Sequence, residues 1–440
     1  MLKFFSKLFV PFSLYFLIIP DIYSTTTTTG GSFKLPYKRH RLNRKNSPIH
    51  AITMNKIKNL FQQKYKLLTK RRANEYETPL IDSYNTIFTA TVTIGGYMLY
   101  LFTYDPSHFY LKYYSFTQST PGQEFNVVID TGSTSFWVLD SSCCQSNSEE
   151  NGDSIVNKFD SSSSSTFLTT NTEFECRYAD GTFSEGFLGI DKLKFGSKND
   201  PNTFTVPTAL IGLASDAQSG GSMFELKIDG IFGLGPPRSD DLCGFESPLY
   251  TAYQNKLINK SIFSVYMHNS KDSGNGEYGG DITFGAIDKE HCGSPVHWVK
   301  AHNSIYWRFR LDSLSHKGNS IDIKSKEAIS DTGSSLIAGP KTAVKHIYDS
   351  IGDIEIYEGM ILIPCDKDFE PVVFRIDGMD FKLGKEVLTI RNEDIGDEFC
   401  EFGIASGGSE LWIFGDPFIR KYCTVYDFGQ RKIGFVAQKQ

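Results

Sequence analysis

The sequence predicts a mainly β protein with two related lobes, on three observations. Short apolar runs between Gly, Asn, Asp and Ser turns dominate the chain, and long helical periods are few. Its 440 residues exceed what one hydrophobic core usually holds. The sequence Asp-Thr-Gly-Ser occurs at 130–133 and again at 331–334, each time directly after an apolar run typical of a buried strand.

The two Asp-Thr-Gly-Ser copies place Asp130 and Asp331 where a strand turns. A carboxylate at such a junction is costly to bury unless it is paired, hydrogen-bonded or protonated. For a single copy we would favour an Asx-type turn. Two copies, both after apolar strands, instead predict two half-domains that bring their carboxylates together.

The first 24 residues are typical of a secretory signal peptide. Lys3 and Lys7 precede an apolar segment at 8–19, and Ser24 is a small residue suited to cleavage. The segment is too short to span a bilayer well, and a buried N-terminal helix is the less favoured alternative. We therefore expect the protein in the secretory pathway, either secreted or in an acidic vacuole, a lysosome-like organelle or a secretory organelle.

Charge divides the chain after the signal peptide. Residues 25–72 hold 13 Lys and Arg and no Asp or Glu, whereas residues 73–440 hold 30 Lys and Arg against 50 Asp and Glu, which is −20. A basic arm can bind nucleic acid or an acidic membrane. Behind a signal peptide, an acidic partner within the chain is favoured. We predict that residues 25–78 form a removable basic propeptide, with an amphipathic helix over 52–68.

The stretch 96–119 interrupts an otherwise regular hairpin. Residues 86–94 alternate as a half-buried strand, and a second strand leads from Phe125 to Asp130. Between them, 96–119 holds nine Tyr or Phe residues without a clear period. It could be an aromatic binding loop, a packing element or translated non-coding sequence. We favour the last, because its deletion would restore a short turn.

Further elements are expected on both sides of the second motif. A strand over 174–178 runs into a turn at 179–182, which predicts a β-hairpin tip. Residues 250–257 and 343–351 are predicted as helices, one in each half.

With these residues in hand, the chain resembles the pepsin-like aspartic proteases, the pepsin and cathepsin D family, from about 33 to 439. The motifs are the two Asp-Thr-Gly-Ser copies, Tyr178 before the hairpin tip, the Asp-Gly-Ile-Phe-Gly-Leu-Gly run at 229–235, and 410–422. A narrower likeness to the plasmepsins rests on the Lys-, Asn- and Tyr-rich composition.

The resemblance implies a bilobal acid protease fold, with an active-site cleft between β-rich lobes at 79–266 and 267–440 and a β-hairpin flap. It implies an aspartic endopeptidase made as a secreted zymogen and active at acidic pH, with no cofactor and no metal. The implied partners are polypeptide substrates and the chain's own propeptide as inhibitor. We expect a monomer that binds no nucleic acid.

By resemblance, Asp130 and Asp331 are the catalytic dyad that activates water. The supporting residues are the braces Thr131 and Thr332, the carboxylate partners Ser133 and Ser334, and the closely approaching Gly132 and Gly333. The flap and substrate residues are Tyr178, Ala179, Asp180 and Gly181, with Trp137 bonded to the Tyr178 hydroxyl. Ala179 and Asp180 replace the Gly-Thr pair common in pepsins.

Eight cysteines in a secreted chain predict disulfides. The resemblance implies Cys365 with Cys400. The remaining expectations are Cys243 with Cys292, Cys176 with Cys143 or Cys144, and Cys423 as a buried free thiol. The adjacent Cys143 and Cys144 raise a metal site, but no His stands at ligand spacing.

Acid should trigger removal of the propeptide between Arg72 and Pro79, because carboxylates paired with its cations lose that stabilisation as pH falls. Lys64 and Lys66 are candidates to reach the dyad. A non-catalytic peptide-binding homologue with the same fold is the alternative function. A nucleic-acid binder is excluded because the basic arm follows a signal peptide.

Overall fold

The structure is a computed structural model, and the described residues lie in the second of two compact units, Arg71–Gln440. It describes 76–439 except for 84–86, 97–98, 106–109, 117–121, 145–155, 180, 201–203, 219–226, 238–242, 269–276, 303, 358 and 392–396. The predicted signal peptide, all but the last residues of the predicted propeptide, and the predicted helix over 52–68 lie outside the described residues.

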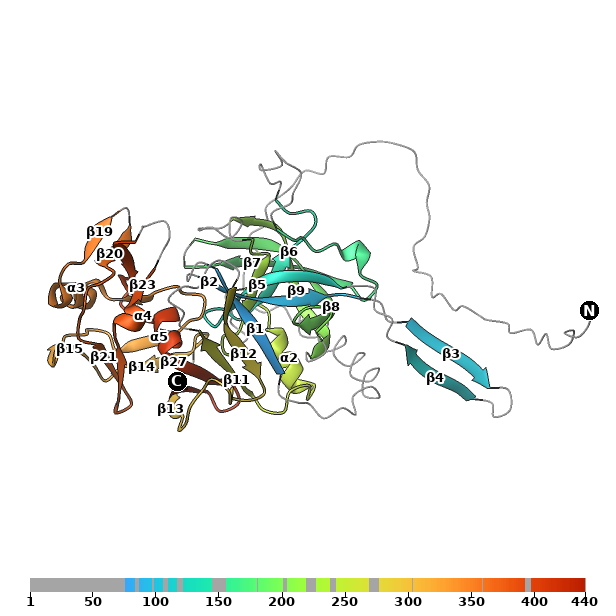
Figure 1. The fold of residues 1–440 in the computed structure, drawn as a ribbon. Helices are drawn as coiled ribbons and strands as arrows, with labels where there is room; N and C mark the ends of the chain where they lie inside the picture. The colour runs from blue at the N-terminus through green and yellow to red at the C-terminus, as the bar shows by residue number, and fades with distance from the viewer. Residues whose placement is uncertain are drawn as a thin grey trace, which may run out of the picture. The chain divides into compact units, whose positions relative to one another are not determined.

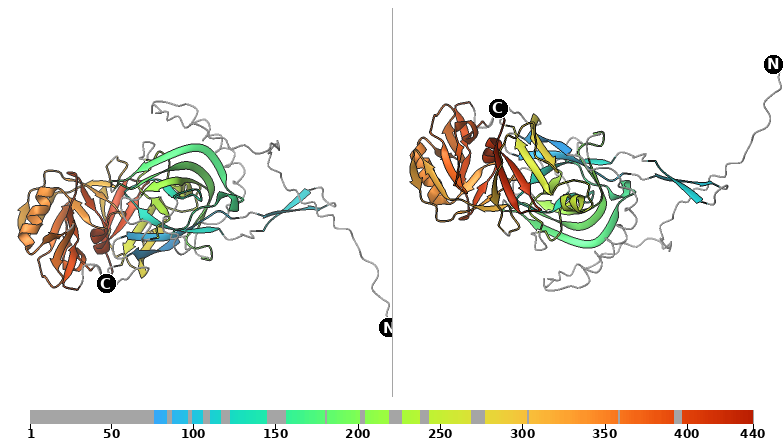
Figure 2. Two further views of the ribbon diagram at one scale, coloured as in Figure 1. Left: turned by 90° about the horizontal axis from the view of Figure 1, so that it is seen from above. Right: turned by 90° about the horizontal axis from the view of Figure 1, so that it is seen from below.

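Strands dominate the described chain, as predicted (Figure 1). The largest sheet has thirteen strands, in the order β13 (His297–Lys300), β28 (Lys432–Ala437), β27 (Tyr422–Asp427), β11 (Ile262–Met267), β12 (Glu277–Phe284), β1 (Tyr76–Ser83), β2 (Ile87–Ile94), β5 (Gln123–Asp130), β10 (Gly230–Gly233), β6 (Phe136–Leu139), β9 (Thr205–Gln218), β8 (Phe183–Phe195) and β7 (Leu168–Arg177). Figure 2 shows the red strands β27 and β28 beside the yellow β11 and β12 and the blue β1. The sheet thus joins the two ends of the described chain.

Four smaller sheets complete the strands. They contain β14 (Arg308–Arg310), β17 (Glu327–Ser330), β26 (Trp412–Phe414), β18 (Ile337–Gly339) and β25 (Ile404–Ser406); β16 (Asn319–Ile321), β15 (Ser313–His316), β21 (Val372–Ile376) and β22 (Met379–Leu383); β19 (Glu355–Tyr357), β20 (Met360–Pro364), β24 (Phe399–Phe402) and β23 (Thr389–Ile390); and β3 (Leu99–Asp105) with β4 (Tyr110–Phe116).

The helices are short: α2 (Pro248–Gln254), α3 (Lys341–Ile351), α4 (Lys385–Leu388), α5 (Asp416–Lys421) and the 3₁₀ turn η1 (Ser161–Ser163). The two predicted helices are present, but both begin two residues earlier than expected. The side chain of Ser247 accepts a hydrogen bond from Leu249 N, and Pro248 occupies the first turn, so α2 starts there. The helix α3 begins directly after Pro340, which occupies the cap position without a side-chain hydrogen bond.

The two halves repeat one strand arrangement around the Asp-Thr-Gly-Ser loops. In the first half the order is β5-β10-β6-β9, where β10 is parallel to β5 and antiparallel to β6, and β9 is parallel to β6. The second half repeats it as β17-β26-β18-β25. This repeat confirms the predicted pair of related halves, and the fold is the bilobal fold of pepsin-like proteins.

The interrupted hairpin keeps an unbroken register. The strands β2 and β5 pair from Thr89 opposite Val128 to Ile94 opposite Gln123. The strands β3 and β4 pair with each other in a sheet of their own. Residues 95–122 therefore connect two residues that already face each other, so the hairpin itself does not need 96–119.

The structure pairs all eight cysteines. Cys365 is bonded to Cys400, the pair that the resemblance implies. The other bonds are Cys143–Cys144, Cys176–Cys243 and Cys292–Cys423. The expected pairing of Cys243 with Cys292, that of Cys176 with Cys143 or Cys144, and the expected free thiol at Cys423 are wrong.

The positions of the strands explain these corrections. Cys176 and Cys243 pack in one small apolar cluster around Trp137. The backbone of Cys292 forms an isolated β-bridge with Gln438, just beyond β28. The strand β28 pairs with β27, and β27 carries Cys423. Spacing along the sequence does not reveal which strands lie side by side, so it could not identify these pairs.

Candidate active site

The first Asp-Thr-Gly-Ser loop leaves the sheet at the end of β5. Asp130 pairs with Gly233 in the parallel strand β10 and is only 7% exposed. Gly132 N donates to Asp130 Oδ1 at 2.8 Å, and the Ser133 hydroxyl donates to Asp130 Oδ2. Both carboxylate oxygens therefore have partners within their own turn.

The second loop repeats this geometry after β17. Gly333 N donates to Asp331 Oδ1 at 2.9 Å, and Ser334 Oγ donates to Asp331 Oδ2 at 2.8 Å. Asp331 N donates to Phe414 O of β26 at 3.0 Å. The two carboxylates are thus presented by the same local turn.

Two threonines join the loops across the halves. Thr131 N donates to Thr332 Oγ1 at 3.0 Å, and Thr332 N donates to Thr131 Oγ1 at 2.9 Å. The two hydroxyls then donate to backbone carbonyls of the opposite half, Thr131 to Ser330 O at 3.1 Å and Thr332 to Ile129 O at 2.5 Å. These four bonds hold the residues that flank the carboxylates in reciprocal positions.

The glycines of the loops lie against the opposite carboxylate. A Cβ added to Gly132 would lie 2.5 Å from Asp331 Oδ1, and one added to Gly333 would lie 2.7 Å from Asp130 Oδ1. Any larger residue would push the carboxylates apart. The glycines therefore permit the close approach of Asp130 and Asp331.

The two carboxyl groups have coupled ionisation. The pKa of Asp130 is raised above its ordinary value. The larger cause is burial, and the second is the negative charge of Asp331. Hydrogen bonds from Ser133 and Gly132 oppose that shift. Because two close carboxylates cannot both ionise easily, the charge of Asp331 favours the protonated form of Asp130.

The strand that leads to Asp130 has a brace that the sequence analysis did not identify. Asp229 is fully buried and accepts from Asn126 N at 2.7 Å and from Asn157 N at 2.6 Å. It therefore fixes β5 four residues before Asp130. The sequence feature that could have indicated this brace is the Asp at the start of the apolar run 229–235.

The predicted hairpin tip lies at the turn between β7 and β8. Arg177 pairs with Phe183, and Tyr178 N donates to Thr182 O at 2.8 Å. Trp137 Nε1 donates to the Tyr178 hydroxyl at 2.7 Å, and the Trp137 side chain is fully buried. Ala179 and Gly181 lie in the tip, while Asp180 is outside the described residues.

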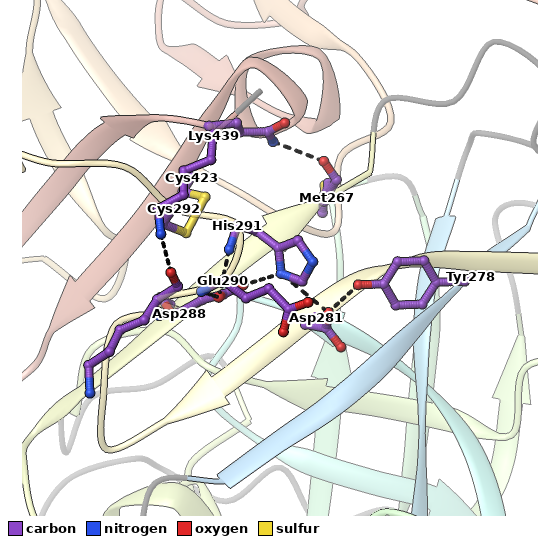
Figure 3. A network of polar contacts seen from close by, with 12 residues as sticks. Met267, Tyr278, Asp281, Asp288, Glu290, His291, Cys292, Cys423 and Lys439 are labelled. Atoms are coloured by element: carbon purple, nitrogen blue, oxygen red, sulfur yellow. Dashed lines mark hydrogen bonds and ion pairs between the residues drawn. A yellow bond between two sulfur atoms is a disulfide. The ribbon is translucent and has the colours of Figure 1, made fainter.

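Away from these loops, one group of described residues has the composition of a metal site (Figure 3). Ligand atoms of Asp281, Asp288 and His291 lie within 4.8 Å of one another. His291 Nδ1 lies 2.7 Å from Asp288 Oδ2, and the Tyr278 hydroxyl donates to Asp281. Asp288 Oδ1 accepts from His291 N at 3.0 Å and also from Glu290 N. These hydrogen bonds close the turn after β12, so we assign the group as a structural network.

Comparisons with known proteins agree with the geometry. The family model for eukaryotic aspartyl protease matches residues 113–438. Pepsin-3 of Oryctolagus cuniculus is 33% identical over 327 residues, which cover 72% of this chain and 78% of the relative. Chymosin of Camelus dromedarius is 33% identical, covering 76% and 82%, and cathepsin D of Gallus gallus is 32% identical, covering 72% and 78%.

Two β-rich halves that each present a braced aspartate define the class of aspartic proteases. The chain belongs to the eukaryotic aspartyl protease family, and its enzyme type is aspartic endopeptidase. No helix in the described part of the chain is long and apolar enough to cross a membrane.

Proposed function

We propose that Asp130 and Asp331 are the catalytic dyad of an acid-active endopeptidase made as a secreted zymogen. The observation that carries the proposal is the reciprocal bracing of the two Asp-Thr-Gly-Ser loops by Thr131 and Thr332. Such bracing fixes two carboxyl groups for joint action on one water molecule. A lone structural Asx turn has no need of a partner loop.

The chemistry follows from one shared proton. One carboxyl group of the pair carries that proton, and the other is the base. The base takes a proton from water as the water oxygen bonds to the carbonyl carbon, and the protonated carboxyl group gives its proton to the carbonyl oxygen. Collapse of the tetrahedral intermediate breaks the C–N bond, and the amine leaves with a proton returned through the dyad.

The hairpin tip supplies the substrate contacts in this proposal. The bond from Trp137 to the Tyr178 hydroxyl fixes the tyrosine at the base of the tip, so that the backbone of Ala179 and Gly181 is presented to a peptide. Polypeptides are therefore the substrates. Asp180 gives a preference for basic side chains if it faces the substrate.

The basic propeptide acts as inhibitor. It carries 13 Lys and Arg, and residues 73–440 carry a formal charge of −20, so protonation of the body's carboxylates weakens the attraction between the two as pH falls. The strand β1 begins at Tyr76 and pairs with β12 from there to Asp82. Cleavage before Tyr76 keeps that strand whole, so we place the cut between Arg72 and Tyr76.

The relatives named pepsin, chymosin and cathepsin D support passage through the secretory pathway to an extracellular or acidic compartment. We propose a monomer with no cofactor. The alternative, a peptide-binding homologue without turnover, keeps the same fold but has no need of the full set of dyad, threonine braces and hairpin tyrosine.

The test is cleavage of a peptide library by recombinant protein at about pH 4, with and without the inhibitor pepstatin. Cleavage that pepstatin blocks and that Asp130→Asn abolishes supports the proposal, with the exposed Asp322→Asn as control. Pepstatin binding without cleavage, after the propeptide is removed, would favour the non-catalytic alternative. Processing of the zymogen at equal rates near pH 4 and pH 7 would contradict the acid trigger.

A further inference from the structure

Ser330, the residue before Asp331, is polar at a position where the first half of the chain is apolar. It ends β17 and is fully buried, and its counterpart Ile129 is 2% exposed. A buried hydroxyl needs a hydrogen-bond partner to offset its loss of water. The partner is Tyr426, whose hydroxyl oxygen lies 2.9 Å from Ser330 Oγ.

Tyr426 is held firmly under the two loops. It lies on β27, opposite Phe263 of β11 and Ile433 of β28, in the sheet that joins the two ends of the described chain. Its ring stacks on Phe263, with centroids 4.6 Å apart, and packs against Trp307 at 5.1 Å. The side chain is fully buried, and this burial raises the pKa of its hydroxyl, which therefore stays protonated.

Through Ser330, the Tyr426 hydroxyl is linked to both Asp-Thr-Gly-Ser loops. It is hydrogen-bonded to Ser330 Oγ, directly before the second loop, and the backbone of Ser330 bonds to Thr131, the brace of the first loop. Thr131 Oγ1 in turn donates to Ser330 O, and Ser330 N donates to Trp307 O, both at 3.1 Å. Tyr426 thus holds Ser330, the residue that connects the Asp331 loop to the threonine beside Asp130.

We propose that the Ser330–Tyr426 hydrogen bond is a positioning contact of the catalytic dyad, which rests on the proposed function of Asp130 and Asp331. The contact sets the spacing of the two carboxyl groups by fixing Ser330, which is bonded to Thr131 of the other loop, to one rigid side chain of the central sheet. The coupling of the two carboxyl groups depends on that spacing, because like charges repel less when they lie farther apart.

The informative substitution is Tyr426→Phe, which keeps the stacked ring and removes the hydroxyl. We expect kcat to fall roughly tenfold with KM changed less than about twofold, because misplaced groups slow the chemical step more than binding. Weaker coupling brings the two apparent pKa values of the dyad together. The pH profile of kcat should therefore narrow, its acid limb moving up and its alkaline limb moving down.

Two further variants separate positioning from stability. Tyr348→Phe is the matched control, because it removes another tyrosine hydroxyl, whose partner is Ile404 O at 2.7 Å rather than a residue of either Asp-Thr-Gly-Ser loop. The double variant Ser330→Ala/Tyr426→Phe removes both polar partners, so no buried hydroxyl of the pair is left unsatisfied. Its Tm should return toward that of the wild type while its pH profile stays narrow.

A wild-type pH profile in Tyr426→Phe, or a profile that recovers together with Tm in the double variant, would overturn the positioning role. Loss of wild-type cleavage altogether is a failure of the proposed function instead. Pepstatin binding needs no turnover, so in that event the wild type and Tyr426→Phe are compared by the pH dependence of their pepstatin affinity. A narrower pH range of binding in Tyr426→Phe supports the inference, and an unchanged range contradicts it.

Discussion

The Thr332 hydroxyl makes two of the four bonds that cross between the halves, so its replacement tests the brace directly. Its Oγ1 accepts from Thr131 N at 3.0 Å and donates to Ile129 O at 2.5 Å. Thr332→Val keeps the shape of the side chain and removes both bonds. A backbone N–H and a backbone C=O are then left without that partner.

The expected loss of stability follows from burial. Thr131, Ile129 and Thr332 are each at most 2% exposed, so water cannot replace the missing hydroxyl. Each unsatisfied buried group costs about 1–3 kcal/mol, which gives about 2–6 kcal/mol for the pair. The control Thr332→Ser keeps the hydroxyl and removes one methyl group, at a cost of about 1 kcal/mol.

Unfolding in guanidinium chloride, with the disulfides intact, measures both free energies under the same conditions. Activity of the folded fraction should also fall in Thr332→Val, because the brace fixes the loops that present the carboxyl groups. A free energy of unfolding that falls no more in Thr332→Val than in Thr332→Ser would refute the reasoning. The hydroxyl would then contribute no more to stability than the methyl group.

Two other predictions concern pH and the inserted stretch. Burial raises the pKa of both Asp130 and Asp416, so their contribution to stability is complete below the ordinary Asp pKa and is lost as pH rises toward the folded values. The free energy of unfolding should decline above about pH 4, and Asp130→Asn should flatten that slope. Deletion of 96–119, which joins Gly95 to Thr120, should leave Tm unchanged or raised, because Ile94 already faces Gln123. A fall of Tm on deletion, together with a spliced transcript that retains these codons, would show that the stretch belongs to the protein.

Much of the fold could be predicted because it depends on local pattern. The alternation over 86–94 identified β2, and the apolar runs before the two motifs identified β5 and β17. The dyad loops were predictable for the same reason, since each Asp, Gly and Ser contacts residues within its own turn.

What could not be predicted depends on distant strands. The pairing of β1 with β12, and of β11 with β27, brings together segments that no local pattern connects. Cys292 meets Cys423 only through that sheet, so a free thiol at Cys423 was a reasonable but wrong expectation. The contact between Tyr426 and Ser330 could not be predicted for the same reason, because 96 positions separate the two residues.

In the proposed mechanism, Asp130 and Asp331 act as one unit with one shared proton. The most direct measurement is kcat for one peptide from about pH 2 to about pH 8, in the wild type, in Asp130→Asn, in Asp331→Asn and in the double variant. Groups that act as a unit are non-additive, so each single variant should lose as much activity as the double. A single variant that retains substantial cleavage, or a double whose loss equals the product of two partial losses, would contradict the claim.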